Sequence, residues 1–202
     1  VGTSRRVENL KQARNAIEIP VNGKIVMPGF VDASLNLAVE TPPGSSQSPK
    51  KRKKGSDFHA ETVSLLRSCL QHGTLTAEVK ANVDGLDTRT CFSLFRQLAK
   101  IDCNPVQIVR TCRVSRSPDP DEPASKRLAD ALAALAGRKL VDCLELKVGP
   151  ESMLGSTALV RAAEQSKLAV KLLWPGGSPD TLADVLSGFN PVTVCCPCHL
   201  SS

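Results

Sequence analysis

The sequence has no tyrosine, one tryptophan and three histidines, and aromatic residues make up 3% of its 202 positions. Its core must therefore be built mainly from leucine, valine, isoleucine and alanine. No apolar run approaches the ~20 residues of a membrane span, and no charged start precedes the apolar segment of a signal peptide. We therefore expect a cytoplasmic protein of one domain, or of one domain and a fragment.

Cysteine is abundant, with eight residues. Five of them are scattered through apolar or helical stretches. Because nothing indicates secretion, we expect these five to be reduced and structural, since a buried free cysteine behaves as a small hydrophobic residue. They are Cys69, Cys91, Cys103, Cys112 and Cys143.

Positive charge is concentrated in one short run. The net charge is +6, and five cations are consecutive: Lys50, Lys51, Arg52, Lys53 and Lys54. The rest of the chain is nearly balanced, which argues against a broad nucleic-acid surface. The run favours a solvated insertion, with a nuclear-targeting signal or a weak polyanion contact as the alternatives. It lies within residues 40–56, which are rich in proline, serine and lysine and are predicted to be disordered.

Strand and helix patterns alternate along the whole chain. This alternation predicts an α/β fold with a parallel sheet. Because a complete (β/α)₈ barrel needs about 250 residues, we predict a partial TIM-type barrel of six parallel strands in sequential order, with open edges. The predicted strands are 24–30, 74–80, 106–114, 140–148, 168–174 and 191–196, and the predicted helices are 58–72, 88–100, 126–136, 156–166 and 180–186.

Residues 21–37 read V-N-G-K-I-V-M-P-G-F-V-D-A-S-L-N-L. This segment resembles the G-K-x-V-x-P-G-F-V-D-x-H-x-H-L signature of the amidohydrolase superfamily. The resemblance implies that residues 1–22 are a remnant of a small β-domain and residues 23–202 a portion of a barrel. In that family the two histidines end the first barrel strand and bind the catalytic metal. Ser34 and Asn36 stand in their places.

Two further segments resemble imidazolonepropionase within that superfamily. Residues 73–87 keep a Gly-Thr, Glu-x-Lys, Gly-Leu-Asp frame, and residues 141–145 read V-D-C-L-E, similar to the family's V-D-x-F-C-E strand. The His-Leu pair of the sixth strand is present as His199 and Leu200. The resemblance makes Lys80, Glu145 and His199 the substrate-binding candidates.

The resemblance also locates a third lost ligand, because Leu173 stands where the fifth strand would end in a histidine. Serine and asparagine are poor ligands for zinc or iron, and leucine is none. Without a Lewis acid, water is not activated for hydrolysis. Ser34, Asn36, Leu173 and His199 are therefore degenerate site positions, and we predict no metal ligand and no cofactor.

Two functions remain open on these observations. The first is a catalytically degraded, imidazolonepropionase-related protein acting as a structural or interaction module, with a protein partner or a second copy at its open sheet edges. The alternative is an active metal-dependent hydrolase of cyclic C–N bonds. Its zinc or iron would then need ligands outside this chain, such as an aspartate of an eighth strand beyond Ser202.

A cysteine cluster, Cys195-Cys196-Pro197-Cys198-His199, ends the last predicted strand. It matches the haem-attachment pattern C-x-x-C-H and resembles the redox motif C-x-P-C. Zinc binding through Cys195 and Cys198 is a third reading. A strand end without function is favoured over all three, because no export signal and no following helix accompany the motif.

Overall fold

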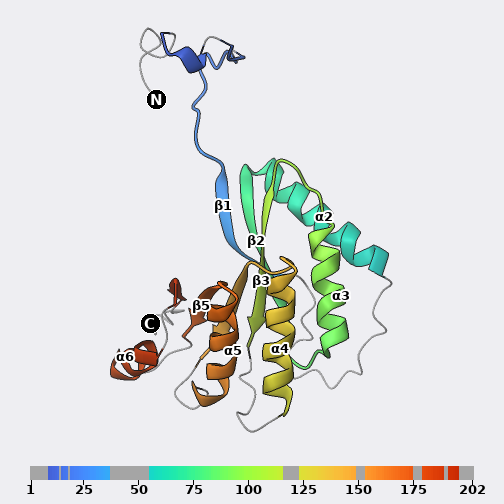
Figure 1. The fold of residues 1–202 in the computed structure, drawn as a ribbon. Coiled ribbons are helices and arrows are strands. Elements are labelled where there is room, and N and C mark those ends of the chain that lie inside the picture. Colours follow the sequence, from blue (N-terminus) through green and yellow to red (C-terminus); the bar gives the residue numbers. More distant parts are fainter. Residues whose placement is uncertain are drawn as a thin grey trace, which may run out of the picture.

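The computed structural model describes residues 9–13, 15–17, 19–36, 55–115, 123–148, 153–174, 179–188 and 191–195. Within these ranges, strands and helices alternate from residue 30 onward (Figure 1). The strands are β1 (Phe30–Asn36), β2 (Thr74–Asn82), β3 (Gln107–Val114), β4 (Cys143–Lys147), β5 (Ala169–Leu173) and β6 (Thr193–Cys195). The helices are η1 (Lys11–Ala13), α2 (Gly55–Gln71), α3 (Thr88–Ala99), α4 (Pro123–Gly137), α5 (Met153–Gln165) and α6 (Pro179–Gly188).

The strands form one sheet in the order β1-β2-β3-β4-β5-β6, and every neighbouring pair is parallel. The prediction of six parallel strands in sequential order is therefore confirmed. Glu78 of β2 reaches Lys171 of β5, with Oε2 and Nζ 2.7 Å apart. A flat sheet would hold those two strands ~14 Å apart, at ~4.8 Å per strand. The sheet is thus curled into a partial TIM-type barrel, and the face that carries these side chains is concave.

The core lies between the sheet and its helices. Alternate strand residues such as Val79, Leu144 and Leu172 are buried against helix residues such as Phe95 and Leu132, each at most 1% exposed. Alternation of side chains along each strand sends the intervening residues to the concave face. The apolar core therefore forms on the helix side of the sheet. Because the sequence has few aromatic residues, this core consists largely of aliphatic side chains.

The predicted first strand, 24–30, is wrong by six residues, because β1 begins at Phe30. Phe30 is paired with Thr74, the first residue of β2, and its N–H donates to the carbonyl of Gly73 at 2.9 Å. The described residues before Phe30 extend beyond the start of β2, and no strand of the described fold pairs with them. Hydrophobic alternation marks a segment suited to a strand, but the partner decides where pairing begins.

Two helices begin before their predicted first residues. Gly55 and Ser56 were placed in the disordered insertion 40–56 and belong to α2. Residues 40–54, including the basic run, lie outside the described residues. The helix predicted at 126–136 begins three residues earlier, because Pro123 is the first residue of α4, where the missing N–H of proline costs no helical hydrogen bond.

Candidate functional site

Strand β2 places two charged residues on the concave face. Ala77, Val79 and Ala81 alternate toward the helices and are fully buried. Glu78 and Lys80 occupy the positions between them and are 4% and 8% exposed. A buried charge is tolerated only when it is paired or hydrogen-bonded. Partners for both side chains must therefore come from neighbouring strands.

Glu145, on β4, is the partner of Lys80. Its Oε2 accepts a hydrogen bond from Lys80 Nζ at 2.5 Å. Its Oε1 lies 3.0 Å from Arg113 Nε, an ion pair by distance although the N–H is not aligned for a hydrogen bond. Glu145 is only 2% exposed. One buried carboxylate therefore sits between two cations from β2 and β3.

Glu78 is held in a similar way. Its Oε1 accepts a hydrogen bond from the Thr111 hydroxyl at 2.6 Å, and its Oε2 accepts one from Lys171 Nζ at 2.7 Å. Burial disfavours the charge of Lys171, but the hydrogen bond to Glu78 and the negative charge of Glu78 outweigh burial and raise the pKa of Lys171. The cationic form of Lys171 is therefore stabilised in the folded protein.

Together these side chains form what we call the concave network: Glu78, Lys80, Thr111, Arg113, Glu145 and Lys171. Three cations face two carboxylates, so the network carries one net positive charge. Each carboxylate is already neutralised within the network. Neither is free to act as a general base or to bind a divalent cation without displacing a lysine or an arginine.

Cys143 borders the network on β4. Burial raises the pKa of its thiol, and the charge of Lys171 opposes that rise only in part. Burial also strongly raises the pKa of Cys112. All five scattered cysteines are free thiols, and four of them are buried, as the sequence predicted. The thiolate forms of Cys112 and Cys143 are therefore disfavoured, which suits a packing role rather than nucleophilic chemistry.

Of the degenerate site positions, Ser34 and Asn36 lie on β1 and Leu173 lies on β5. Ser34 is exposed, in a bulge of β1 between Asp32 and Leu35, and its N–H donates to Asp32 Oδ1 at 3.0 Å. Asn36 ends β1 in register with Lys80. Leu173 ends β5 in register with Lys147. Strands β2, β3 and β4 separate β1 from β5 in the sheet, so the three positions share only the C-terminal edge. His199 lies outside the described residues.

The residues at these positions do not fit the zinc or iron that the resemblance implies. A hydroxyl, an amide and an aliphatic side chain stand where the resemblance would place three imidazoles, and the carboxylates of the concave network hold cations of the protein itself. Over the described ranges, the structure has no group of three or more His, Cys, Asp or Glu side chains that could hold a metal ion. The cysteine cluster lies outside those ranges except for Cys195.

Several residues of the recognised sequence frame have structural roles. A Cβ at Gly29 would lie 2.3 Å from Leu75 Cγ, so only glycine allows the chain to pass there beside β2. Gly73 adopts φ 89° at the turn after α2. Asp87 caps α3 by accepting the N–H of Thr90 at 2.8 Å. Asp142 holds Arg110 through two hydrogen bonds of 2.9 Å. These four residues therefore have structural roles that do not depend on catalysis.

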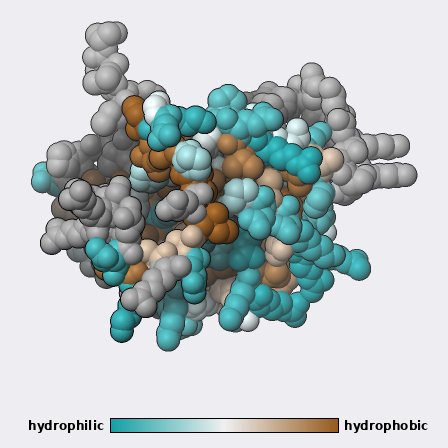
Figure 2. Space-filling view, turned by 90° about the horizontal axis from the view of Figure 1, so that it is seen from above, coloured by the Kyte–Doolittle hydropathy of each residue, from teal (hydrophilic) through white to brown (hydrophobic). Residues whose placement is uncertain are grey.

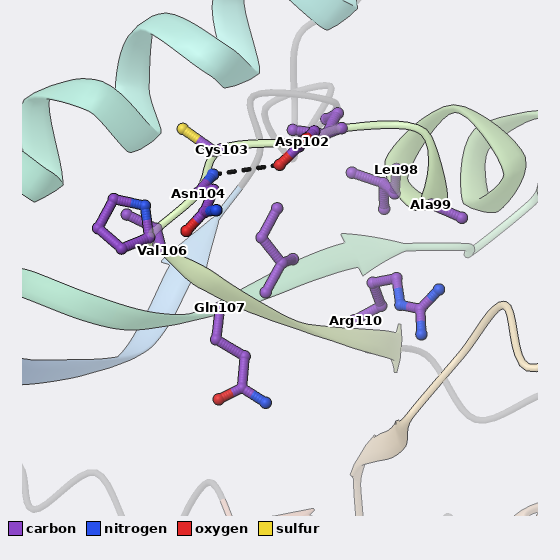
Figure 3. A pocket seen from close by; sticks show the side chains of 11 residues that line it. Leu98, Ala99, Asp102, Cys103, Asn104, Val106, Gln107 and Arg110 are labelled. Carbon is purple, nitrogen blue, oxygen red and sulfur yellow. Dashed lines mark hydrogen bonds between the residues drawn. The ribbon is translucent and has the colours of Figure 1, made fainter. Parts of the chain in front are cut away.

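A separate cavity of about 390 Å³ lies at the start of β3 (Figure 3). Its lining includes Leu98, Val106, Gln107 and Arg110, and Asp102 Oδ1 accepts the N–H of Asn104 at its rim at 3.2 Å. This is the amino end of the sheet, opposite the edge where barrel enzymes place their active sites. The guanidinium of Arg110 is already bound to Asp142, so it is not free to bind a ligand in the cavity.

Sequence reasoning identified Lys80 and Glu145 but did not assign roles to Glu78, Arg113 or Lys171. Each of the three interrupts an apolar strand at an alternate position, facing away from the helices. A charged residue at such a position in several neighbouring strands is the signal that could have found them. Their pairing could not be predicted, because it depends on strand register and on the curl of the sheet.

No family model and no curated protein matches the chain. Among solved structures, the chain is similar to the carboxyl transferase domain of pyruvate carboxylase from Rhizobium etli, with 12% identity, a TM-score of 0.44, 68% of this chain covered and 24% of that chain. It is also similar to the complete multifunctional pyruvate carboxylase from Rhizobium etli, with 13% identity, a TM-score of 0.42, 68% of this chain and 14% of that chain. The chain thus spans about a quarter or less of either neighbour. The partial-barrel assignment rests on the strand order and curl of the chain itself.

Proposed function

We propose that this chain is a catalytically degraded, amidohydrolase-like protein, related in its sequence frame to imidazolonepropionase, that acts as an interaction module. The observation that carries the proposal is the concave network. Its two carboxylates are neutralised by Lys80, Arg113 and Lys171 on the face where a barrel enzyme needs a free base or a metal. A positively charged concave face repels a divalent cation, and without that cation water has no activating Lewis acid.

The interaction role is supported by the amino-terminal end of the described fold. The segment before β1 extends away from the sheet (Figure 1) and exposes large apolar side chains, with Ile25 89% and Val26 74% exposed. Phe30 and Val31 at the start of β1 are 54% and 69% exposed. Figure 2 shows hydrophobic side chains around the centre of the face seen from above. Such a concentration of exposed apolar surface marks an interaction site.

Strand β1 is also the outer strand of the sheet, so one side of its backbone faces no other strand of the described fold. Outer strands with apolar side chains pair readily with a strand from another chain. The proposed occupant is a second copy of this chain, placed edge to edge along β1. The β6 edge is the weaker candidate, because Val192 is the one large exposed hydrophobic residue described beside it.

We expect Val31→Lys to weaken self-association, because a lysine on an edge strand opposes pairing with another chain. Sedimentation velocity over a concentration series should show the unmodified chain shifting to a dimer and the variant remaining monomeric at the same concentrations. Val192→Lys, a similarly exposed valine at the other edge, is the matched control and should dimerise normally. Loss of the dimer in Val192→Lys instead would move the interface to β6, and a monomeric unmodified chain would remove the proposed role.

Metal content tests the other half of the proposal. Purified protein is expected to hold well under one equivalent of zinc or iron per chain, measured by elemental mass spectrometry after dialysis, and to leave imidazolone and simple cyclic amides intact. Restoring imidazoles with Ser34→His, Asn36→His and Leu173→His together should raise zinc retention. Stoichiometric metal in the unmodified protein would favour an active hydrolase of cyclic C–N bonds over the degraded enzyme.

A further inference from the structure

A groove of about 550 Å³ runs along the outer surface of α3, and we call it the α3 groove. Its lining includes four cationic side chains and no acidic one. The cations are Arg89, Arg96, Lys100 and Arg138. This distribution is unexpected in a chain whose charge is otherwise nearly balanced outside the basic run 50–54.

Helical spacing explains how three of the cations gather. Arg89 and Arg96 of α3 and its C-cap residue Lys100 are separated by seven and four positions, which puts them on one side of the helix. The opposite face is buried against the sheet through residues such as Leu94 and Phe95. Arg138 comes from the turn directly after α4 and closes the groove from the other side.

Phe92 holds two of these cations in place. The guanidinium carbon of Arg96 lies 5.8 Å from the centroid of the Phe92 ring, and that of Arg138 lies 5.1 Å from it. Stacking engages the flat face of a guanidinium and leaves its N–H groups free to bind oxygen atoms. The ring thus gathers two like charges, which repel one another, at one place in the groove.

The α3 groove contrasts with the concave network. There, each cation is matched by a carboxylate at 3.0 Å or less. In the α3 groove, the neutralising charge has to come from outside the lining. Arginine pairs suit phosphate in particular, because the planar guanidinium donates two parallel hydrogen bonds to two phosphate oxygens.

We propose that the α3 groove binds a small molecule that carries an oligophosphate group, such as a nucleoside triphosphate. Its volume falls within the ~300–1,000 Å³ of small-molecule sites. Four cations around one groove match the several charges of a di- or triphosphate. An extended nucleic-acid backbone would instead require a longer cationic stripe, and the rest of the chain outside the run 50–54 is nearly balanced in charge. This site is independent of the proposed edge interaction.

Isothermal titration calorimetry of the full chain with inorganic triphosphate tests the proposal. Saturable binding is expected, and it should weaken as salt rises because charge pairing drives it. The double variant Arg96→Gln/Arg138→Gln should lower the affinity at least about tenfold, since it removes charge-assisted hydrogen bonds. Arg161→Gln, an exposed arginine of α5, is the matched control and should bind as the unmodified chain does.

Phe92→Leu separates a built site from diffuse surface charge. It keeps all four cations but removes the ring that positions two of them, so the affinity should fall several-fold while the net charge is unchanged. Equal affinities for Phe92→Leu and the unmodified chain would overturn the proposal. The proposal would also be overturned if triphosphate showed no saturable binding, or if Arg161→Gln weakened triphosphate binding as much as Arg96→Gln/Arg138→Gln does. Binding of an oligonucleotide to the groove that triphosphate does not displace would contradict it as well. Competition by adenosine triphosphate against inorganic triphosphate distinguishes a nucleotide from the free anion, and either result supports the site. Thermal unfolding of each variant confirms that it is folded.

Discussion

Glu145→Gln should lower the free energy of unfolding by about 3–5 kcal/mol, the usual loss when one partner of a buried ion pair is removed. Glu145 is 2% exposed and neutralises Lys80 and Arg113 at the same time. Glutamine keeps the shape of the side chain but leaves the buried Lys80 and the half-buried Arg113 with no carboxylate between them. Lys80 is itself only 8% exposed, so water can compensate little of that loss.

Urea unfolding followed by circular dichroism measures this loss, with Glu164→Gln as the control. Glu164 is exposed on α5, and its variant should change the unfolding free energy by at most about 0.5 kcal/mol. Because domains are stable by only about 5–15 kcal/mol, Glu145→Gln can fail to fold. The double variant Glu145→Gln/Lys80→Met removes one of the uncompensated cations and should then regain stability. A loss below about 1 kcal/mol in Glu145→Gln would mean that the network is solvated like a surface pair.

The elements of the fold could be predicted from the sequence because each carries its own local signal. The strict alternation through Leu75, Ala77 and Val79 marks β2, and Gly73 marks the end of α2 before it. The start of β1 could not be predicted in the same way. Apolar residues 24–29 suit a strand as well as residues 30–36 do, and only the position of Thr74 in space decides which of them is paired.

Only the part of the candidate site that lies in the segments resembling a known family could be predicted from the sequence. Lys80 and Glu145 were identified from short sequence frames, and the structure joins them directly. The contact between Glu78 and Lys171 could not be predicted, because it crosses two intervening strands and exists only in a curled sheet. Likewise, nothing local in the sequence relates Phe92 to Arg138, which lie on different elements.

The described fold therefore places charge in two different ways. On the concave face, cations and carboxylates from four strands neutralise one another, and both carboxylates are buried. On the outer surface of α3, cations gather with no carboxylate in the lining. The first arrangement contributes to the stability of the fold, and the second is the proposed oligophosphate site. Among the helices that the structure describes, none is long and apolar enough to cross a membrane.

Lys171→Met should lower the free energy of unfolding by about 2–3 kcal/mol near neutral pH, the range for removing a charged partner from a buried hydrogen bond. Buried Glu78 would lose its cation, although it would keep the hydrogen bond from the Thr111 hydroxyl. We expect a smaller loss than for Glu145→Gln, because Lys171 is 20% exposed and water replaces part of the interaction.

The same ion pair gives stability a defined dependence on alkaline pH. The pKa of Lys171 is raised in the folded protein above its ordinary value of 10.5. A folded-state pKa above the unfolded one means that the folded state holds the proton more tightly. Its contribution is therefore complete below the ordinary pKa and is lost as pH rises through the raised folded pKa. Returning the protein from alkaline to neutral pH should restore the contribution of Lys171 to stability fully.

Unfolding curves recorded from neutral pH to above about pH 11 separate this contribution from the titration of other lysines. The unmodified chain should lose stability on the alkaline side more steeply than Lys171→Met, in which the titrating group is absent. Lys147→Met is the matched control: Lys147 is exposed, occupies the next concave-facing position after Glu145 on β4, and should leave the steep alkaline loss unchanged. If Lys171→Met and the unmodified chain lose stability in parallel above pH ~10.5, then Lys171 is not held as a cation by Glu78, and the concave network is weaker than its distances indicate.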